Sequence, residues 1–181
     1  LFNFYNAPGN TIKFQSRFSG ELKVEKKEEK LFLDFPADEL SESDNYQQVK
    51  LGIGVSPKEL YKGKTDFLAV INSEEELINL DVNISEINKL DARGLIVTAK
   101  SNKYDFVSRF FAPQCGVDED PVTGSAHTSL IPYWAKHLGK SSMTAKQISK
   151  RGGVLDCSFN GSRVSIGGEA KLYLKGEIFI V

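Results

Sequence analysis

The sequence predicts an α+β fold in which mostly antiparallel strands wrap around a central helix. Two observations support this class. Short segments that alternate apolar and polar residues recur along the 181 residues, with polar turns between them. Only residues 128–138 carry apolar side chains at the spacing of a substantial buried helix. Because this pattern indicates strands joined by hairpins rather than by regular βαβ crossovers, we do not expect a doubly wound parallel sheet.

The first third of the chain is strand-rich. Alternation predicts strands at 12–17, 21–25 and 31–35, and the mixed-charge run 25–30 is typical of a solvated hairpin tip. Pro36 closes the third strand. The polar, acidic stretch that follows has no strong periodicity. We therefore place a lobe boundary there, between residues 1–40 and 41–171.

The middle of the chain mixes short helices with apolar strands. Short helices are expected at 46–51 and 85–90, and capping signatures predict helix starts at Ser56 and Ser73. Buried strands are expected at 67–71, 94–99 and 104–112. Pro132 should kink the main helix or mark the end of a tighter first turn, and Gly139 is a natural C-cap. The tail predicts further strands at 154–159, 163–166, 171–174 and 177–181.

The composition is that of an ordinary globular protein, with 40% hydrophobic residues and 23 basic against 24 acidic side chains. No basic excess indicates nucleic acid or an anionic membrane as a partner. No apolar run reaches the roughly 20 residues that span a bilayer. Cys115 and Cys157 form no C-x-x-C pair, which fits a reducing, cytoplasmic setting.

The turn before the main helix, Glu119–His127, carries the candidate chemistry. Asp120 precedes Pro121, which biases its backbone toward an extended conformation outside the helix. Its carboxylate is a candidate for proton transfer. The alternative is a charge that only stabilises the helix N-terminus.

Thr123-Gly124-Ser125 stands where the helix begins. The first backbone N–H groups of a helix have no intrahelical partner, and Gly124 lets a ligand approach them closely. Together with the Ser125 hydroxyl, these donors suit a carboxylate or phosphate. The alternative is that Thr123 or Ser125 is simply an N-cap.

Four other reactive side chains have a purely structural interpretation, and two of them also have a functional one. His127 could be a general acid or base, or a helix residue that packs, and His137 fits the last helical turn as a structural cation. Cys115 could be a nucleophile, although a buried inert thiol is the simpler expectation, and Cys157 in a strand should be packed. The scattered His and Cys residues predict no metal site.

Several motifs together resemble one family. Asp120-Pro121-Val122-Thr123-Gly124-Ser125-Ala126-His127, followed by Pro132-Tyr133-Trp134, is similar to the signature of PhzF-like isomerases from phenazine biosynthesis, which share the diaminopimelate epimerase fold. The resemblance extends over essentially the whole chain. Further matching segments are Leu31–Ala37, Ser108–Pro113, Arg151-Gly152-Gly153 and Gly167-Gly168.

The resemblance implies two similar lobes, each a barrel-like sheet around a helix, with the active site in the cleft between them. It implies cofactor-free proton transfer on a small substrate that bears a carboxylate. Asp120 would be the auxiliary catalytic acid, while Gly124 and Ser125 would hold the substrate carboxylate. The family's principal glutamate and its Gly-His pair match no residue here.

We therefore expect residues 41–171 to form a complete C-terminal lobe and residues 1–40, with 172–181 returning to them, to form part of the N-terminal lobe. The missing lobe or a second copy of the chain would be its partner, and these 181 residues alone should be inactive. Two alternatives remain: a non-catalytic protein that binds small carboxylates, and a racemase that depends on Cys115.

Overall fold

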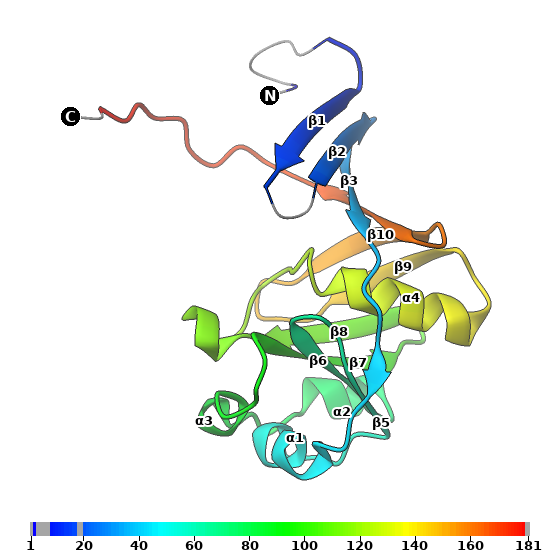
Figure 1. Cartoon of the computed structure of the whole chain (residues 1–181), viewed down its shortest axis with the longest axis vertical. Coiled ribbons are helices and arrows are strands. Elements are labelled where there is room, and N and C mark those ends of the chain that lie inside the picture. Colours follow the sequence, from blue (N-terminus) through cyan, green and yellow to red (C-terminus); the bar gives the residue numbers. More distant parts are fainter. Residues whose placement is uncertain (1, 3–7, 18–19, 180–181) are drawn as a thin grey trace.

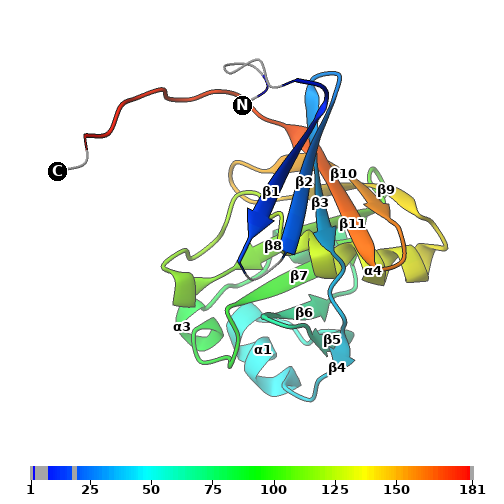
Figure 2. The same cartoon turned by 45° about the horizontal axis from the view of Figure 1, so that its top comes forward.

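The computed structural model describes residues 2, 8–17 and 20–179, and its strands form one 11-stranded sheet (Figure 1). The order of the strands across the sheet is β1-β2-β3-β11-β10-β9-β8-β7-β6-β5-β4 (Figure 2). The strands are β1 (Thr11–Ser16), β2 (Gly20–Lys27), β3 (Lys30–Pro36), β4 (Ser41–Glu42), β5 (Glu59–Lys62), β6 (Asp66–Val70), β7 (Gly94–Lys100), β8 (Phe106–Phe111), β9 (Ser142–Gln147), β10 (Gly153–Phe159) and β11 (Arg163–Glu169). The helices are α1 (Tyr46–Ile53), α2 (Glu74–Ile78), α3 (Ile84–Ile87), the 3-10 turn η1 (Pro113–Cys115) and α4 (His127–Leu138).

Most neighbouring strands are antiparallel, as expected, but two pairs are not. In the described part of the chain, β6 pairs with β7 and β8 pairs with β9 in parallel. A parallel pair needs a crossover, and α2 with α3 forms the first while η1 with α4 forms the second. The expectation of hairpins throughout was therefore wrong at these two places. The first pairing matters for the candidate site, because it brings the starts of β6 and β7 next to each other.

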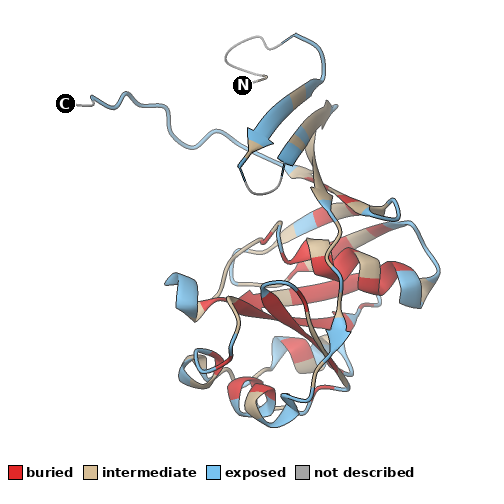
Figure 3. Cartoon of the chain, in the orientation of Figure 1, coloured by how far each residue is buried: buried red, intermediate tan, exposed pale blue. Residues whose placement is uncertain are grey.

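The first three strands form the antiparallel meander that alternation predicted. The β2–β3 hairpin turns at Glu28, whose φ is +54°, within the mixed-charge run. Strand β3 then pairs with β11 from Lys30 to Pro36 and so joins the meander to the rest of the sheet. No described residue from 8 to 36 is buried, and Figure 3 shows these strands as exposed or intermediate. The meander therefore has no hydrophobic core of its own among the described residues.

The central part of the sheet is buried on both faces. Along β6, β7 and β8, alternate side chains enter two different hydrophobic clusters, as the period of a strand requires. In β8, Phe106 and Phe110 lie on one face while Val107 and Phe111 lie on the other. The first cluster includes side chains of α4, and the second includes side chains of α1, α2 and α3. Figure 1 shows α4 on one side of β6, β7 and β8 and the other three helices on the opposite side.

Helix α4 is the dominant helix, and side chains from β6 to β11 contribute to the cluster around it. Trp134 stacks on Phe106 with 5.6 Å between ring centroids, and its indole N–H donates to Thr98 Oγ1 at 3.0 Å. Pro132 lies inside the helix and cannot donate to the carbonyl of Thr128. That carbonyl instead accepts the backbone N–H of Asp38 at 3.0 Å. The carbonyl left without a helical donor by Pro132 therefore links α4 to the segment after β3.

The helix ends were predicted with mixed success. Gly139 adopts the left-handed conformation at the end of α4, and the Ser73 side chain caps α2 by accepting from the Glu76 N–H. Helix α3 begins earlier than expected because Asn83 caps it. The helix start predicted at Ser56 was wrong. That segment leads into β5, where Leu60 pairs with Ala69 and lies in the second cluster, so tertiary pairing overrides the local capping signal.

Two further corrections concern strands near the C-terminus. Strand β9 was not expected, although it joins β8 to β10. The strand predicted at 171–174 is absent, and 177–179 is also outside any strand, while residues 180 and 181 lie outside the described residues. Tyr173 is 99% exposed. The return of 172–181 to the first strands, and the division of the chain at residue 40, remain predictions.

Candidate active site at the N-terminus of α4

The turn between β8 and α4 is attached to the sheet at its acidic end. The Asp120 N–H donates to the carbonyl of Phe110 at 3.0 Å, next to the end of β8. Glu119 forms a two-bonded ion pair with Arg109, with Nε–Oε1 and Nη2–Oε2 distances of 2.7 and 3.1 Å. Glu119 is thus engaged by a cation, and the two neighbouring carboxylates have different surroundings.

Asp120 is half-buried and its side chain is held in place rather than projecting freely. Its Oδ2 accepts a hydrogen bond from the Thr123 hydroxyl. The buried amide of Gln147 then ties both residues to β9. Its Nε2 donates to the Asp120 carbonyl at 2.7 Å and to Thr123 Oγ1 at 3.1 Å, while its Oε1 accepts the Thr123 N–H at 2.8 Å. One buried side chain therefore links both Asp120 and Thr123 to β9.

The start of α4 supplies the unpaired donors that the sequence predicted. The helix begins at His127 after a tight turn, in which the N–H groups of His127 and Thr128 donate to the carbonyls of Gly124 and Ser125. Ala126 is the N-cap and makes no side-chain cap, so the interpretation of Thr123 or Ser125 as a side-chain cap was wrong. Among the described residues, no acceptor is present for the N–H groups of Gly124, Ser125 and Ala126.

Arg93 joins the site, and sequence reasoning missed it. Its Nη2 donates to Ser125 Oγ at 3.0 Å, and its guanidinium forms a two-bonded ion pair with buried Asp66. The sequence does show a charged residue next to the start of each of two buried strands, Asp66 and Arg93. Their contact follows only from the parallel pairing of β6 and β7, which places Asp66 opposite Gly94.

His127 is completely buried, so its ring has no access to solvent. Its Nδ1 lies 2.7 Å from the Thr123 carbonyl, which can only accept, so Nδ1 carries the proton. The other nitrogen, Nε2, has no hydrogen-bond partner in the described part of the chain. Burial lowers the pKa of His127 to about 4, against a smaller opposing effect of the bond to Thr123. The packing interpretation therefore accounts for His127.

The two cysteines differ in exposure. Cys157 is buried, as expected, and desolvation raises the pKa of its thiol to about 12. Cys115 is exposed, so the expectation of a buried thiol was wrong. It ends η1, the 3-10 turn between β8 and the candidate site. Neither cysteine is in a disulfide, and the described residues contain no group of three or more His, Cys, Asp or Glu side chains arranged to hold a metal.

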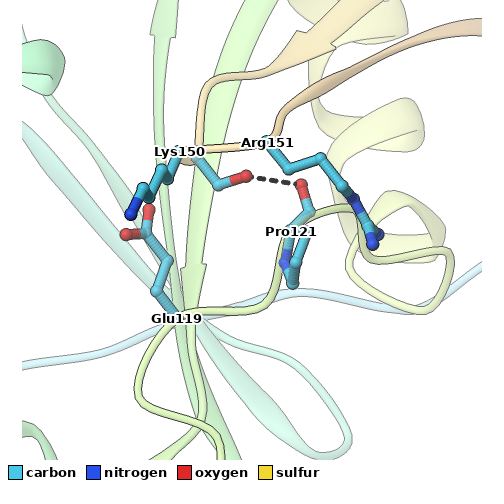
Figure 4. Close-up of a pocket in the computed structure, with 5 residues that line it drawn as sticks. Glu119, Pro121, Lys150 and Arg151 are labelled. Carbon is cyan, nitrogen blue, oxygen red and sulfur yellow. Dashed lines mark hydrogen bonds between the residues drawn. The ribbon is translucent and has the colours of Figure 1, made fainter.

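An open hollow of about 560 Å³ lies beside the turn and is lined by Glu119, Pro121, Ser149, Lys150 and Arg151. Figure 4 shows Lys150 and Glu119 on one side of Pro121 and Arg151 on the other. The dashed line marks the hydrogen bond that the Ser149 hydroxyl donates to the Pro121 carbonyl at 2.8 Å. A second hollow of about 780 Å³ lies between the first three strands and the β10–β11 hairpin. Asp120, Gly124 and Ser125 line neither hollow.

Fold and site together define an α+β protein that presents a carboxylate and a group of unpaired backbone donors at a helix N-terminus. Residues 6–176 match the family model described as phenazine biosynthesis-like protein. The chain belongs to this family. It is 47% identical over 178 residues to a Pseudomonas aeruginosa protein named as an uncharacterized isomerase, covering 98% of this chain and 68% of that protein. A mouse phenazine biosynthesis-like domain-containing protein is 37% identical, with the same coverage.

Solved structures agree with this assignment. A crystal structure of a PhzF family protein from Enterococcus faecalis superimposes with a TM-score of 0.91 at 42% identity, over 99% of this chain and 69% of that one. A hydroxyproline epimerase from Agrobacterium vitis, at 11% identity and a TM-score of 0.52 over 92% of this chain and 58% of that one, shares the fold alone. The chain spans about two thirds of the length of the relatives it matches. No helix in the described ranges is both long and apolar enough to cross a membrane.

Proposed function

We propose that the protein contributes one side of the active site of a cofactor-independent, cytoplasmic isomerase that moves a proton on a small carboxylate-bearing substrate. The observation that carries this proposal is the group of acceptor-free N–H donors at Gly124, Ser125 and Ala126, next to the Asp120 carboxylate. Relatives named as isomerases support the reaction class. The unpaired cysteines fit a reducing compartment.

In this proposal Gly124 and Ser125 bind the substrate carboxylate. Backbone N–H groups at a helix N-terminus favour an anion through hydrogen bonds and through the helix dipole. An exposed Ser125 hydroxyl adds a further donor. Binding places the substrate carbon that bears the carboxylate near Asp120. When the proton leaves this carbon, its electron pair stays on the substrate, and the N–H donors stabilise the negative charge that develops. The same proton or a solvent proton then returns to carbon, so the reaction needs no net oxidation.

A second acid or base completes this reaction, and we propose that it lies on polypeptide outside these 181 residues. The relatives are longer than this chain, and the family resemblance assigns the principal base to a glutamate of the N-terminal lobe. The first three strands have no buried side chain among the described residues, and Phe14 is 42% exposed, which suits a surface that another lobe or a second copy covers. Residues 41–171 would then be the C-terminal lobe.

Exchange of substrate protons with solvent tests the proposal, because it reports proton transfer whatever product forms. The native polypeptide would be incubated in D2O with panels of amino acids, hydroxy acids and unsaturated acids, and deuterium at carbon followed by NMR. We expect exchange with at least one carboxylic acid. Asp120→Asn should slow it by about 100-fold or more, because positioned acid–base groups contribute roughly 10²–10⁴. The matched control is Asp118→Asn, which changes an exposed neighbouring carboxylate.

The outcome separates this function from the alternatives. Saturable carboxylate binding without exchange in the native polypeptide would favour the non-catalytic binding protein. Exchange that survives Asp120→Asn but is lost on alkylation of the exposed Cys115 would favour the thiol-dependent racemase. Exchange by the 181 residues alone would contradict the placement of the principal base on another segment.

A further inference from the structure

Besides its contact with Ser125, the guanidinium of Arg93 is held in place by Asp66. It directly precedes β7, and Asp66 begins β6, its parallel neighbour. Arg93 Nε donates to Asp66 Oδ1 at 2.9 Å, and Nη2 donates to Oδ2. The Asp66 side chain is only 3% exposed, so the pair shields its carboxylate from water. A two-bonded guanidinium–carboxylate pair restricts both the position and the plane of the arginine.

Neighbouring contacts make this pair more rigid. The Thr65 hydroxyl donates to Asp66 Oδ2 at 3.0 Å, and the backbone N–H of Arg93 donates to the Thr65 carbonyl at 2.8 Å. The guanidinium lies over the ring of Phe110, with 5.4 Å from Cζ to the ring centroid. Phe110 also accepts the Asp120 N–H through its carbonyl. The same strand end thus orients both the guanidinium and the catalytic candidate.

The bond from Arg93 to Ser125 has a directional consequence. Arginine has donors only, so Ser125 Oγ must accept in the 3.0 Å contact from Nη2. The serine proton is then free to point away from the guanidinium. Ser125 is exposed and lies beside the acceptor-free N–H groups of Gly124 and Ala126. An anion bound there would meet a serine hydroxyl already oriented as a donor.

We propose that Arg93 is a positioning residue, which turns the Ser125 hydroxyl into a preorganised donor for the substrate carboxylate. This inference rests on the proposed carboxylate-binding role of Gly124 and Ser125. Arg93 acts through Ser125 rather than as a free cation, because Asp66 already neutralises its charge. Preorganisation increases affinity by removing the cost of ordering the hydroxyl during binding.

The electrostatic surroundings of Arg93 keep its guanidinium protonated. Its hydrogen bond with Asp66 raises the pKa of the guanidinium, against the opposing effect of burial. The Asp120 carboxylate adds a smaller stabilising charge, so it lies within electrostatic range of Arg93. The donor to Ser125 is therefore present at every pH at which the protein is folded, and the effect on binding should not titrate near neutral pH.

A binding experiment on the native polypeptide tests this role. The probe is sodium benzoate, with benzamide as the uncharged control, and the readout is the NMR shift of the Gly124 and Ser125 amides. The main variant is the double substitution Asp66→Asn/Arg93→Met, since it leaves no unpaired buried carboxylate. Arg93→Lys is a second variant that keeps a cation for Asp66 but loses the fork geometry. Arg163→Met removes a comparable, remote arginine pair to Asp34 as a matched control.

We expect the dissociation constant for benzoate to rise about tenfold in the double variant and in Arg93→Lys, and to stay unchanged in Arg163→Met. The substitutions should be repeated in a Ser125→Ala background, where removing Arg93 should change affinity by less than about twofold, because the two residues act as one unit.

Each contrary result has a distinct meaning. No saturable shift in the wild type, or equal shifts with benzamide, would overturn the carboxylate-binding proposal and this inference with it. Wild-type binding that the double variant and Arg93→Lys both retain would overturn the role of Arg93 alone. Equal losses with and without the Ser125 hydroxyl would show that Arg93 does not act through Ser125.

Discussion

His127 should make the stability of the protein depend on pH in a defined window. The imidazole is fully buried, and its pKa falls from 6.5 to about 4 in the folded state. Between these values the unfolded chain binds a proton at this position and the folded chain does not. The free energy of unfolding therefore rises with pH across the window; the contribution of His127 is complete above about pH 6.5 and is lost as pH falls toward about 4.

The size of the effect follows from the shift. One pKa unit corresponds to about 1.4 kcal/mol, so this group alone should remove about 2.5 kcal/mol between about pH 7.5 and about pH 4.5. Carboxylates also titrate at the lower end, and a variant is needed to separate their contribution. His127→Gln keeps a neutral polar side chain of similar reach but cannot take up a proton.

Urea denaturation of both proteins at several pH values provides the measurement. The variant should be less stable at neutral pH, where it loses fitted packing, and its disadvantage should shrink by about 2.5 kcal/mol at about pH 4.5. Curves for the wild type and His127→Gln that stay parallel over the whole range would refute the assignment of His127 as a buried neutral imidazole.

Two other predictions concern the support of the turn. Gln147→Leu should destabilise the fold by about 1–3 kcal/mol, because it leaves the buried Thr123 N–H without its acceptor, and it should weaken benzoate binding; unchanged binding would show that the amide does not shape the site. Gly94→Ala should lower the free energy of unfolding by about 1–3 kcal/mol in urea denaturation, since a Cβ would lie 2.6 Å from the Phe111 carbonyl oxygen. Gly168→Ala is the control, because a Cβ at that position would meet open space. Equal stability of the two variants would contradict this account.

Local features of the chain were readable from the sequence. The alternation of β8 predicted which side chains share a face, and both faces are buried as that pattern requires. Gly139 and Ser73 act at their helix ends because capping depends on a few neighbouring residues. Ser56 shows the limit of the same reasoning, since its capping signal was outweighed by the pairing of Leu60 with β6.

The candidate site likewise combines residues that a local motif identifies with residues that only the fold brings together. Asp120, Gly124 and Ser125 could be proposed from one short motif, because their chemistry and their position before a helix are local properties. Their catalytic and binding roles remain predictions. Arg93, Asp66 and Gln147 could not be assigned to the site from sequence, since each comes from a different strand or strand end. Only the order of strands in the sheet brings them to the same helix N-terminus.

The sequence alone thus determined the fold class, most secondary structure, and the motif that carries the family. These follow from hydrophobic periodicity and from short-range backbone preferences, which act between residues a few positions apart. Tertiary structure decided the parallel pairing of β6 with β7, the burial of His127 and the exposure of Cys115. These depend on which distant segments pack together, and burial, more than residue type, determines whether an ionisable side chain can exchange a proton with a ligand.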